Sequence, residues 1–268
     1  MYPILGEVFG RQIPAFGVMV ALGFLMGYWF ASAQARKTGI TKPEVIGDLL
    51  MWLLLGGIAG ARILYVTIHW NKYSSDPISA FKIWEGGIVY YGGFLGAFLA
   101  AVIFCRKHKL SLSAIGDLCM PGAMLGQGIG RIGCLLVGDD FGKVAPEGLP
   151  WAITFPRNMP GSLMPPDMTG IPLHPAQLYM MTQSLIIFFI LWMVLKRRKF
   201  EGQVMYLGLM LYPIGRSICE LYRADDEARG IYFGLSTSQW ISIPLFLLGL
   251  VGYLRLRQRP LPATSSSL

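Results

Sequence analysis

Three arginines stand inside segments that are otherwise apolar: Arg62, Arg131 and Arg216. A charge within a membrane is costly unless it is paired, hydrated or able to reach the interface, so such residues mark functional sites by default. Guanidinium groups bind phosphate through paired N–H donors and stabilise charge that develops on a leaving phosphate. The arginines therefore predict a site for an anionic lipid headgroup. The alternative is an ion pair that locks two helices, above all for Arg62 and, with Glu220 one turn later, for Arg216.

The elements that carry these arginines are predicted to be membrane-spanning helices. Of the 268 residues, 54% are hydrophobic and 14% are charged, whereas about 25% are charged in a soluble domain. A helix needs about 20 apolar residues to cross a bilayer. Seven segments qualify: 14–34, 45–68, 88–104, 113–133, 175–195, 204–220 and 238–254. The sequence thus predicts an all-α integral membrane protein, a single polytopic domain over residues 1–268 with seven transmembrane helices.

Basic residues in the connections predict the orientation of these helices. Thirteen lie in the first, third and fifth connections and the C-terminal tail, and seven lie in the N-terminal segment and the other connections. By the positive-inside rule the N-terminus is outside and the C-terminus is cytoplasmic. The unusual polar residues of six helices then lie near the outer face, and the cytoplasmic half holds little beyond Asp48 and Asp117. This one-sided layer disfavours the alternative of a transporter for an anionic solute or lipid.

The fourth connection, residues 134–174, is far longer than the 2–8 residues usual between packed helices. It holds seven prolines. We expect a small subdomain on the outer face, with a short strand at 151–155, where apolar and polar residues alternate.

Glycines at a four-residue spacing predict close contacts between helices. They are Gly23 and Gly27, Gly56 and Gly60, and Gly122, Gly126 and Gly130.

Several other kinds of site are not indicated. The four cysteines have neither a CxxC spacing nor a paired histidine, so we expect no zinc site, no disulfide framework and no cofactor. Short basic clusters between long apolar stretches are typical of membrane flanks and not of a nucleic-acid surface. The N-terminal segment has no basic stretch and no cleavage site, so its apolar run is expected to be a retained span.

Three motifs lie in order near the ends of the predicted helices. They are Gly130-Arg131-Ile132-Gly133-Cys134 through Gly138, His174-Pro175-Ala176-Gln177-Leu178-Tyr179, and Gly215-Arg216-Ser217-Ile218-Cys219-Glu220-Leu221-Tyr222-Arg223. Earlier in the chain stand Gly60-Ala61-Arg62, Trp84-Glu85-Gly86-Gly87 and Tyr91-Gly92-Gly93. Together they resemble the bacterial prolipoprotein diacylglyceryl transferases, over residues from about 14 to 254.

The resemblance implies a multi-pass enzyme of the bacterial inner membrane, with a periplasmic N-terminus and a cytoplasmic C-terminus. Such an enzyme transfers the diacylglyceryl group of phosphatidylglycerol to the lipobox cysteine of a prolipoprotein signal peptide. The reaction makes a thioether, releases glycerol phosphate and is the first step of bacterial lipoprotein maturation. We expect a monomer that binds no nucleic acid. A catalytically weakened lipid-binding paralogue is the alternative.

The resemblance also implies the site residues. Tyr91, Arg131, Asp139 and Arg216 are the candidate catalytic residues, with the two arginines on the phosphate. Binding and support of the headgroup are assigned to Arg62, Gly130, Gly133, Cys134, Gly138, His174, Gln177, Tyr212, Glu220 and Arg223.

Four positions depart from the family's usual pattern. Tyr91 stands where well-known members have histidine, Cys134 where the signature has asparagine, Asp139 where it has glutamate, and Phe16 where a tyrosine is expected. Tyr91, Asp139 and His174 stay open as the group that accepts the thiol proton.

Overall fold

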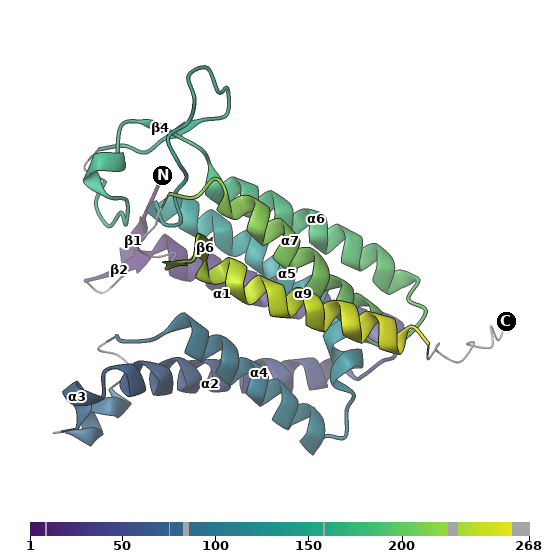
Figure 1. Ribbon diagram of the computed structural model, residues 1–268. Coiled ribbons are helices and arrows are strands. Elements are labelled where there is room, and N and C mark those ends of the chain that lie inside the picture. The colour runs from purple at the N-terminus through teal and green to yellow at the C-terminus, as the bar shows by residue number, and fades with distance from the viewer. Residues whose placement is uncertain (9, 75, 83–85, 158, 225–229, 259–268) are drawn as a thin grey trace. The chain divides into compact units, whose positions relative to one another are not determined.

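The computed structural model describes the chain except for residues 9, 75, 83–85, 158, 225–229 and 259–268 (Figure 1). Trp84 and Glu85 of the third-span motif, and Arg229 and Arg259 of the charge pattern, lie outside the described residues. The chain divides into two compact units. One unit comprises Met1–Ala31 with Gly116–Leu268, and the other comprises Ser32–Ile115.

Long helices lie over the predicted apolar segments. They are α1 (Ala15–Thr38), α2 (Pro43–Ile68), α4 (Tyr90–Lys107), α5 (Leu112–Val137), α6 (Ala176–Lys196), α7 (Gln203–Glu220) and α9 (Thr237–Leu256). Among the described residues, α1, α2, α6 and α9 are long and apolar enough to cross a membrane, judged by length and composition. The chain is therefore mostly helical and has several candidate membrane spans.

Local sequence explains where several of these helices begin and end. Pro43 begins α2, at a position where its missing N–H costs nothing. Ser236 caps α9, because its hydroxyl accepts the N–H of Gln239 while the Gln239 side chain accepts the N–H of Ser236. Gly138, at φ 80°, ends α5 in the left-handed conformation that glycine adopts without strain.

In the unit Ser32–Ile115, glycines allow α2 and α4 to pack backbone against backbone. A Cβ added to Gly56 would lie 2.8 Å from the carbonyl oxygen of Gly96, and one on Gly96 would lie 2.9 Å from the Cα of Gly60. No larger residue fits without moving the helices apart. A short helix, α3 (Trp70–Tyr73), and a 3-10 turn, η1 (Pro77–Phe81), lie in the connection between α2 and α4.

In the unit Met1–Ala31 with Gly116–Leu268, a second glycine contact joins α1 to α5. A Cβ on Gly27 would lie 2.8 Å from the Gly122 oxygen, and one on Gly126 would lie 2.6 Å from the Gly23 oxygen. The predicted role in close packing is confirmed for Gly23, Gly27, Gly56, Gly60, Gly122 and Gly126. It is wrong for Gly130, where an added Cβ would meet no described atom within 4 Å. The core beside them is built from Phe30, Met124, Ile187, Phe188, Leu191, Leu195 and Val204.

Among the described residues, three small two-stranded antiparallel sheets lie at one end of this unit (Figure 1). They pair β1 (Ile4–Val8) with β2 (Arg11–Pro14), β3 (Ile153–Thr154) with β4 (Pro172–Leu173), and β5 (Ile231–Tyr232) with β6 (Leu235–Ser236). The strand expected within 151–155 is present as β3. The long connection, which also contains η3 (Pro166–Met168), has a small core of its own formed by Phe141, Phe155, Met164 and Leu173.

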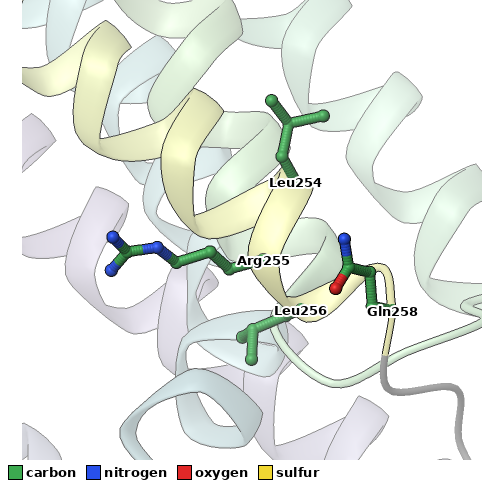
Figure 2. A pocket seen from close by; sticks show the side chains of 4 residues that line it. All are labelled: Leu254, Arg255, Leu256 and Gln258. Atoms are coloured by element: carbon green, nitrogen blue, oxygen red, sulfur yellow. The ribbon is translucent and has the colours of Figure 1, made fainter.

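A hollow at the C-terminal end of α9 is lined by Leu254, Arg255, Leu256 and Gln258 (Figure 2). These four side chains point in different directions around the helix end. Arg255 is the one charged group among them, so this hollow brings no reactive groups together.

Asp117 of α5 ties the start of α7 to the bundle. Its fully buried carboxylate accepts the backbone N–H groups of Gly202 at 2.8 Å, Val204 at 2.8 Å and Met205 at 2.9 Å. The guanidinium of Arg198 donates to the same carboxylate at 3.1 Å. A negative charge at a helix N-terminus satisfies donors that have no partner within the helix.

We expect Asp117→Asn to lower the thermal stability of the protein. The amide loses the charge and one of the two acceptor oxygens, and breaking a buried ionic network costs roughly 3 kcal/mol. The measurement is the unfolding temperature of detergent-solubilised protein, with Asp48→Asn, an exposed aspartate of α2, as the matched control. Equal unfolding temperatures for the two variants would contradict this role of Asp117.

Candidate functional site

A cluster of ionised groups lies where α5 and α7 end, within the unit Met1–Ala31 and Gly116–Leu268. It contains three arginines and three carboxylates: Arg131, Arg216, Arg223, Asp139, Asp140 and Glu220. The name "arginine cluster" refers to these six residues below. Of the six, Asp140 alone is not among the residues predicted from the sequence.

Arg131 is anchored through one corner of its guanidinium. Its Nη1 donates to Oδ2 of Asp140 and lies 3.8 Å from the sulfur of Cys134. Among the described residues, no protein acceptor contacts its Nε or Nη2, and the side chain is 18% exposed. The Nε–Nη2 edge is the side of a guanidinium that binds two oxygens of one phosphate.

Arg216 repeats this arrangement on α7. Its Nη1 pairs with Oε2 of Glu220, one helical turn later, and both side chains are buried. The ion pair considered from the sequence is therefore present. It leaves the Nε–Nη2 edge of Arg216 without a protein partner in the described part of the chain, so the pair and phosphate binding are compatible.

Asp140 bridges two arginines. Its Oδ1 accepts Nη2 of Arg223 at 2.5 Å, while its Oδ2 accepts from Arg131. Burial by itself would raise the pKa of the Asp140 carboxyl, but Arg131, Arg223 and Arg216 together hold that pKa below its ordinary value. Asp140 has φ 54°, a left-handed conformation that aspartate adopts more readily than most residues and that is common at functional sites.

Backbone hydrogen bonds hold the loop of Asp140 against the end of α7. The N–H of Lys143 donates to the Tyr222 carbonyl at 2.8 Å, and the N–H of Ala224 donates to the Phe141 carbonyl at 3.2 Å. The loop after α5 and the segment after α7 are thus joined on both sides of Arg223. Residues far apart in sequence are held at one place.

Cys134 and Gln177 contact the aspartates of the cluster. The buried sulfur of Cys134 lies 3.6 Å from Oδ2 of Asp140, and Nε2 of Gln177 donates to the Asp139 carbonyl at 2.7 Å. The Asp139 side chain in turn accepts the N–H of Asp140 at 2.9 Å. Ligand atoms of Cys134, Asp139 and Asp140 are near enough to share a metal ion, but both oxygens of Asp140 are ion-paired with arginines, so we assign no metal here.

Polar side chains of three helices meet at Tyr212 of α7. Gln127 of α5 donates to the Tyr212 hydroxyl at 3.0 Å, and Gln183 of α6 donates to its carbonyl at 3.5 Å. The sulfur of Cys219 lies 3.7 Å from Oε1 of Gln183. Gln127 and Gln183 were missed from the sequence, although an amide inside an apolar segment is a usable signal.

His174 belongs to an aromatic group beside the cluster. Its Nδ1 lies 3.0 Å from the Tyr179 hydroxyl. The Nε1–H of Trp151 donates to the same hydroxyl at 2.8 Å. The rings of His174 and Tyr222 are 5.2 Å apart between centroids. The described contacts of the imidazole are thus aromatic and phenolic.

The predicted glycines of the site have different surroundings. A Cβ on Gly133 would lie 3.1 Å from the Cβ of Met19 and 3.2 Å from the Cα of Phe16, so this glycine permits α1 to pack on α5. Gly130 has nothing within 4 Å of the same position among the described atoms. Gly138 ends α5 and thereby sets the direction of the loop that carries Asp140.

Arg62 and Tyr91 lie in the other unit, Ser32–Ile115. Arg62 is 6% exposed, and its five N–H groups donate to five backbone carbonyls between 2.7 and 3.2 Å. The acceptors are Ser79, Ala80, Lys82, Gly86 and Gly87. The ion pair considered for Arg62 is thus replaced by carbonyl contacts that organise the connection before α4. Tyr91 lies in the first turn of α4 and is 40% exposed.

Comparison with known proteins matches nearly the whole chain to one family. The family model for prolipoprotein diacylglyceryl transferase matches residues 3–255. A Geobacter sulfurreducens protein named phosphatidylglycerol–prolipoprotein diacylglyceryl transferase is 32% identical over 257 residues, 93% of this chain and 94% of the relative. Two further proteins of the same name are similar to this chain. The one from Shewanella oneidensis is 35% identical and covers 96% of this chain and 92% of the relative. The one from Neisseria meningitidis serogroup B is 32% identical and covers 94% of this chain and 95% of the relative. The chain belongs to the prolipoprotein diacylglyceryl transferase family.

Proposed function

We propose that this protein transfers the diacylglyceryl group of phosphatidylglycerol to the thiol of a lipobox cysteine in a prolipoprotein. The relatives are named for phosphatidylglycerol and prolipoprotein. The observation that carries the proposal is the pairing of Arg131 and Arg216 through Nη1, which leaves two guanidinium edges for the lipid phosphate.

The reaction is a substitution at a saturated carbon. The sulfur attacks the glyceryl carbon attached to the phosphate, so a C–S bond forms while the C–O bond breaks. The electron pair of the broken bond stays on the phosphate oxygen, and the thiol proton is finally carried by the glycerol phosphate that is released. No covalent intermediate with the enzyme is required.

Arg131 and Arg216 stabilise the charge that builds up on the phosphate oxygen as the bond breaks. A preorganised guanidinium does this well in a site with little water, because it needs no reorientation during the reaction. The anchoring carboxylates of Asp140 and Glu220 provide this preorganisation. Arg223, which shares Asp140 with Arg131, is a further contact for the headgroup.

We also propose that all seven long helices cross the bacterial inner membrane, with the N-terminus periplasmic and the C-terminus cytoplasmic. Beyond the four spans that composition indicates, α5 and α7 carry the ionised residues of the site, which lower their hydropathy. Residues 134–174 form the periplasmic subdomain in this topology. A monomeric state, as expected from the sequence, is part of this proposal.

The direct test is to incubate the purified protein with phosphatidylglycerol and a lipobox peptide. Mass spectrometry should detect the peptide carrying a diacylglyceryl group on its cysteine, with glycerol phosphate released in equal amount. Binding of phosphatidylglycerol without any adduct would favour the weakened lipid-binding paralogue.

In this assay, Arg131→Ala and Arg216→Ala should each abolish transfer, and lysine at either position should restore little activity. Lysine supplies a charge but not the planar pair of donors. Arg157→Ala, which removes an exposed arginine of the long connection, is the control and should be as active as wild type. Near-normal turnover of both lysine variants would show that a point charge suffices and would contradict the bidentate contact.

Reporters fused after Arg198 or Arg257 should be cytoplasmic, whereas a reporter within 145–165 should be periplasmic. The reason is the excess of basic residues on one side of the predicted spans. A pair of reporter enzymes, one active only in the cytoplasm and one only in the periplasm, provides the measurement. A cytoplasmic signal from the long connection would overturn the orientation.

Asp139 is our choice for the group that accepts the thiol proton, because it lies within the arginine cluster. Asp139→Asn should lower turnover by about 10²–10⁴-fold, as is typical when a general base is removed. Asparagine keeps an oxygen that can accept the N–H of Asp140 while the negative charge is removed. Tyr91→Phe should cost about tenfold, the loss of one neutral hydrogen bond.

The measurement is the pH dependence of the transfer rate for wild type and both variants on one lipobox peptide. A loss beyond a thousandfold in Tyr91→Phe, with Asp139→Asn unaffected, would make the tyrosine the proton acceptor instead.

A further inference from the structure

We propose that Asp140 is a positioning residue of the headgroup site, whose single carboxylate holds Arg131 and Arg223 side by side so that one phosphodiester contacts both. The inference rests on the proposed function, since the step that it affects is transfer from phosphatidylglycerol. Asp140 itself need not touch the lipid. It acts through the two guanidiniums.

The first support is the division of the carboxylate between two partners. Oδ2 of Asp140 accepts from Nη1 of Arg131, and Oδ1 accepts from Nη2 of Arg223. Because both oxygens belong to one group, the two guanidiniums are neighbours despite their like charges. In surroundings of low dielectric constant that repulsion is strong, and the shared carboxylate offsets it.

The second support is the rigidity of the backbone that carries Asp140. Its N–H donates to the side chain of Asp139, and its left-handed conformation comes two residues after Gly138, the glycine that ends α5. Arg223 lies between Tyr222 and Ala224, both of which bond to the loop after α5. Asp140 therefore joins the arginine of α5 to the arginine that follows α7 through a fixed framework.

The third support is charge, because among the described residues the arginine cluster places carboxylates next to its guanidiniums, with Asp140 beside Arg131 and Arg223 and Glu220 beside Arg216. A carboxylate beside Arg131 weakens the attraction between that arginine and a phosphate. Removing the Asp140 charge should therefore not impair binding of phosphatidylglycerol. It should slow turnover, since Arg131 and Arg223 lose their common anchor and a transition state depends on their placement.

Steady-state transfer with phosphatidylglycerol in mixed micelles tests this expectation. Asp140→Asn should lower kcat by at least about tenfold while the KM for phosphatidylglycerol stays equal or falls. Asparagine suits the test because it also adopts the left-handed conformation. Asp140→Gly, which is unstrained at that φ, provides a second variant that should behave alike, and Asp167→Asn, an exposed aspartate of η3, is the matched control.

A double-mutant cycle with Arg223→Gln identifies the route by which Asp140 acts. If Asp140 acts through Arg223, the kcat losses of the two single variants will not multiply in the double variant. Thermal unfolding of each variant accompanies the kinetics, and the activity of each is expressed per folded protein.

Three results would overturn the role of Asp140: wild-type kinetics in Asp140→Asn and Asp140→Gly, a raised KM at unchanged kcat, or losses that multiply with Arg223→Gln. In each of these, wild-type protein still transfers the lipid, so the proposed function stands. A wild-type protein that makes no adduct would overturn both proposals.

Discussion

A guanidinium in apolar surroundings must be paired, and this constraint governs how the ends of α5 and α7 are built. Arg131 and Arg216 each satisfy it with one carboxylate on one nitrogen. The pairing offsets part of the cost of burying the charge, yet it uses only one of the nitrogens of each guanidinium. A lysine paired in the same way would have no second edge for a ligand. Arginine is therefore needed at these positions, and not just any cation, because the same side chain must be paired with a carboxylate and bind a ligand.

The ion pairs of Arg131 and Arg216 keep their positions only if the helices that carry them do not shift. Contacts along the length of α5 hold this helix in place. Near its start, Asp117 binds the first N–H groups of α7. Along its middle, Gly122 and Gly126 let α1 approach to backbone contact. At its end, Gly138 directs the chain into the loop of Asp140. Close contacts at small residues are how helices associate where lipid removes the hydrophobic drive. The contacts that pack α5 against its neighbours therefore also place the site residues at its end.

The parts of this arrangement that follow local rules could be predicted, and the others could not. Apolar length located the helices, intramembrane charge singled out Arg131 and Arg216, and the i,i+4 spacing suggested the partner of Arg216. Asp140 escaped prediction because its role depends on a left-handed backbone and on pairing with a segment about 80 positions away. The contacts of Arg62 escaped for a similar reason: its partners are backbone carbonyls 17 to 25 residues further on, which no side-chain pattern reveals.

The carboxylates that pair with the buried arginines also affect the rate of product release in the proposed reaction. The lipid brings a phosphodiester with one negative charge, whereas the product is a phosphate monoester that takes up to two near neutral pH, as its second ionisation lies close to pH ~6. Three unpaired arginines would hold that product more tightly than the substrate, and release would limit the rate. Asp140 and Glu220 offset part of the positive charge that attracts this product, although they leave the binding edges of Arg131 and Arg216 open. The arginines then stabilise the transition state as the C–O bond breaks, but they bind the released glycerol phosphate less tightly than unpaired arginines would. A transferase needs this difference in order to release its product and turn over.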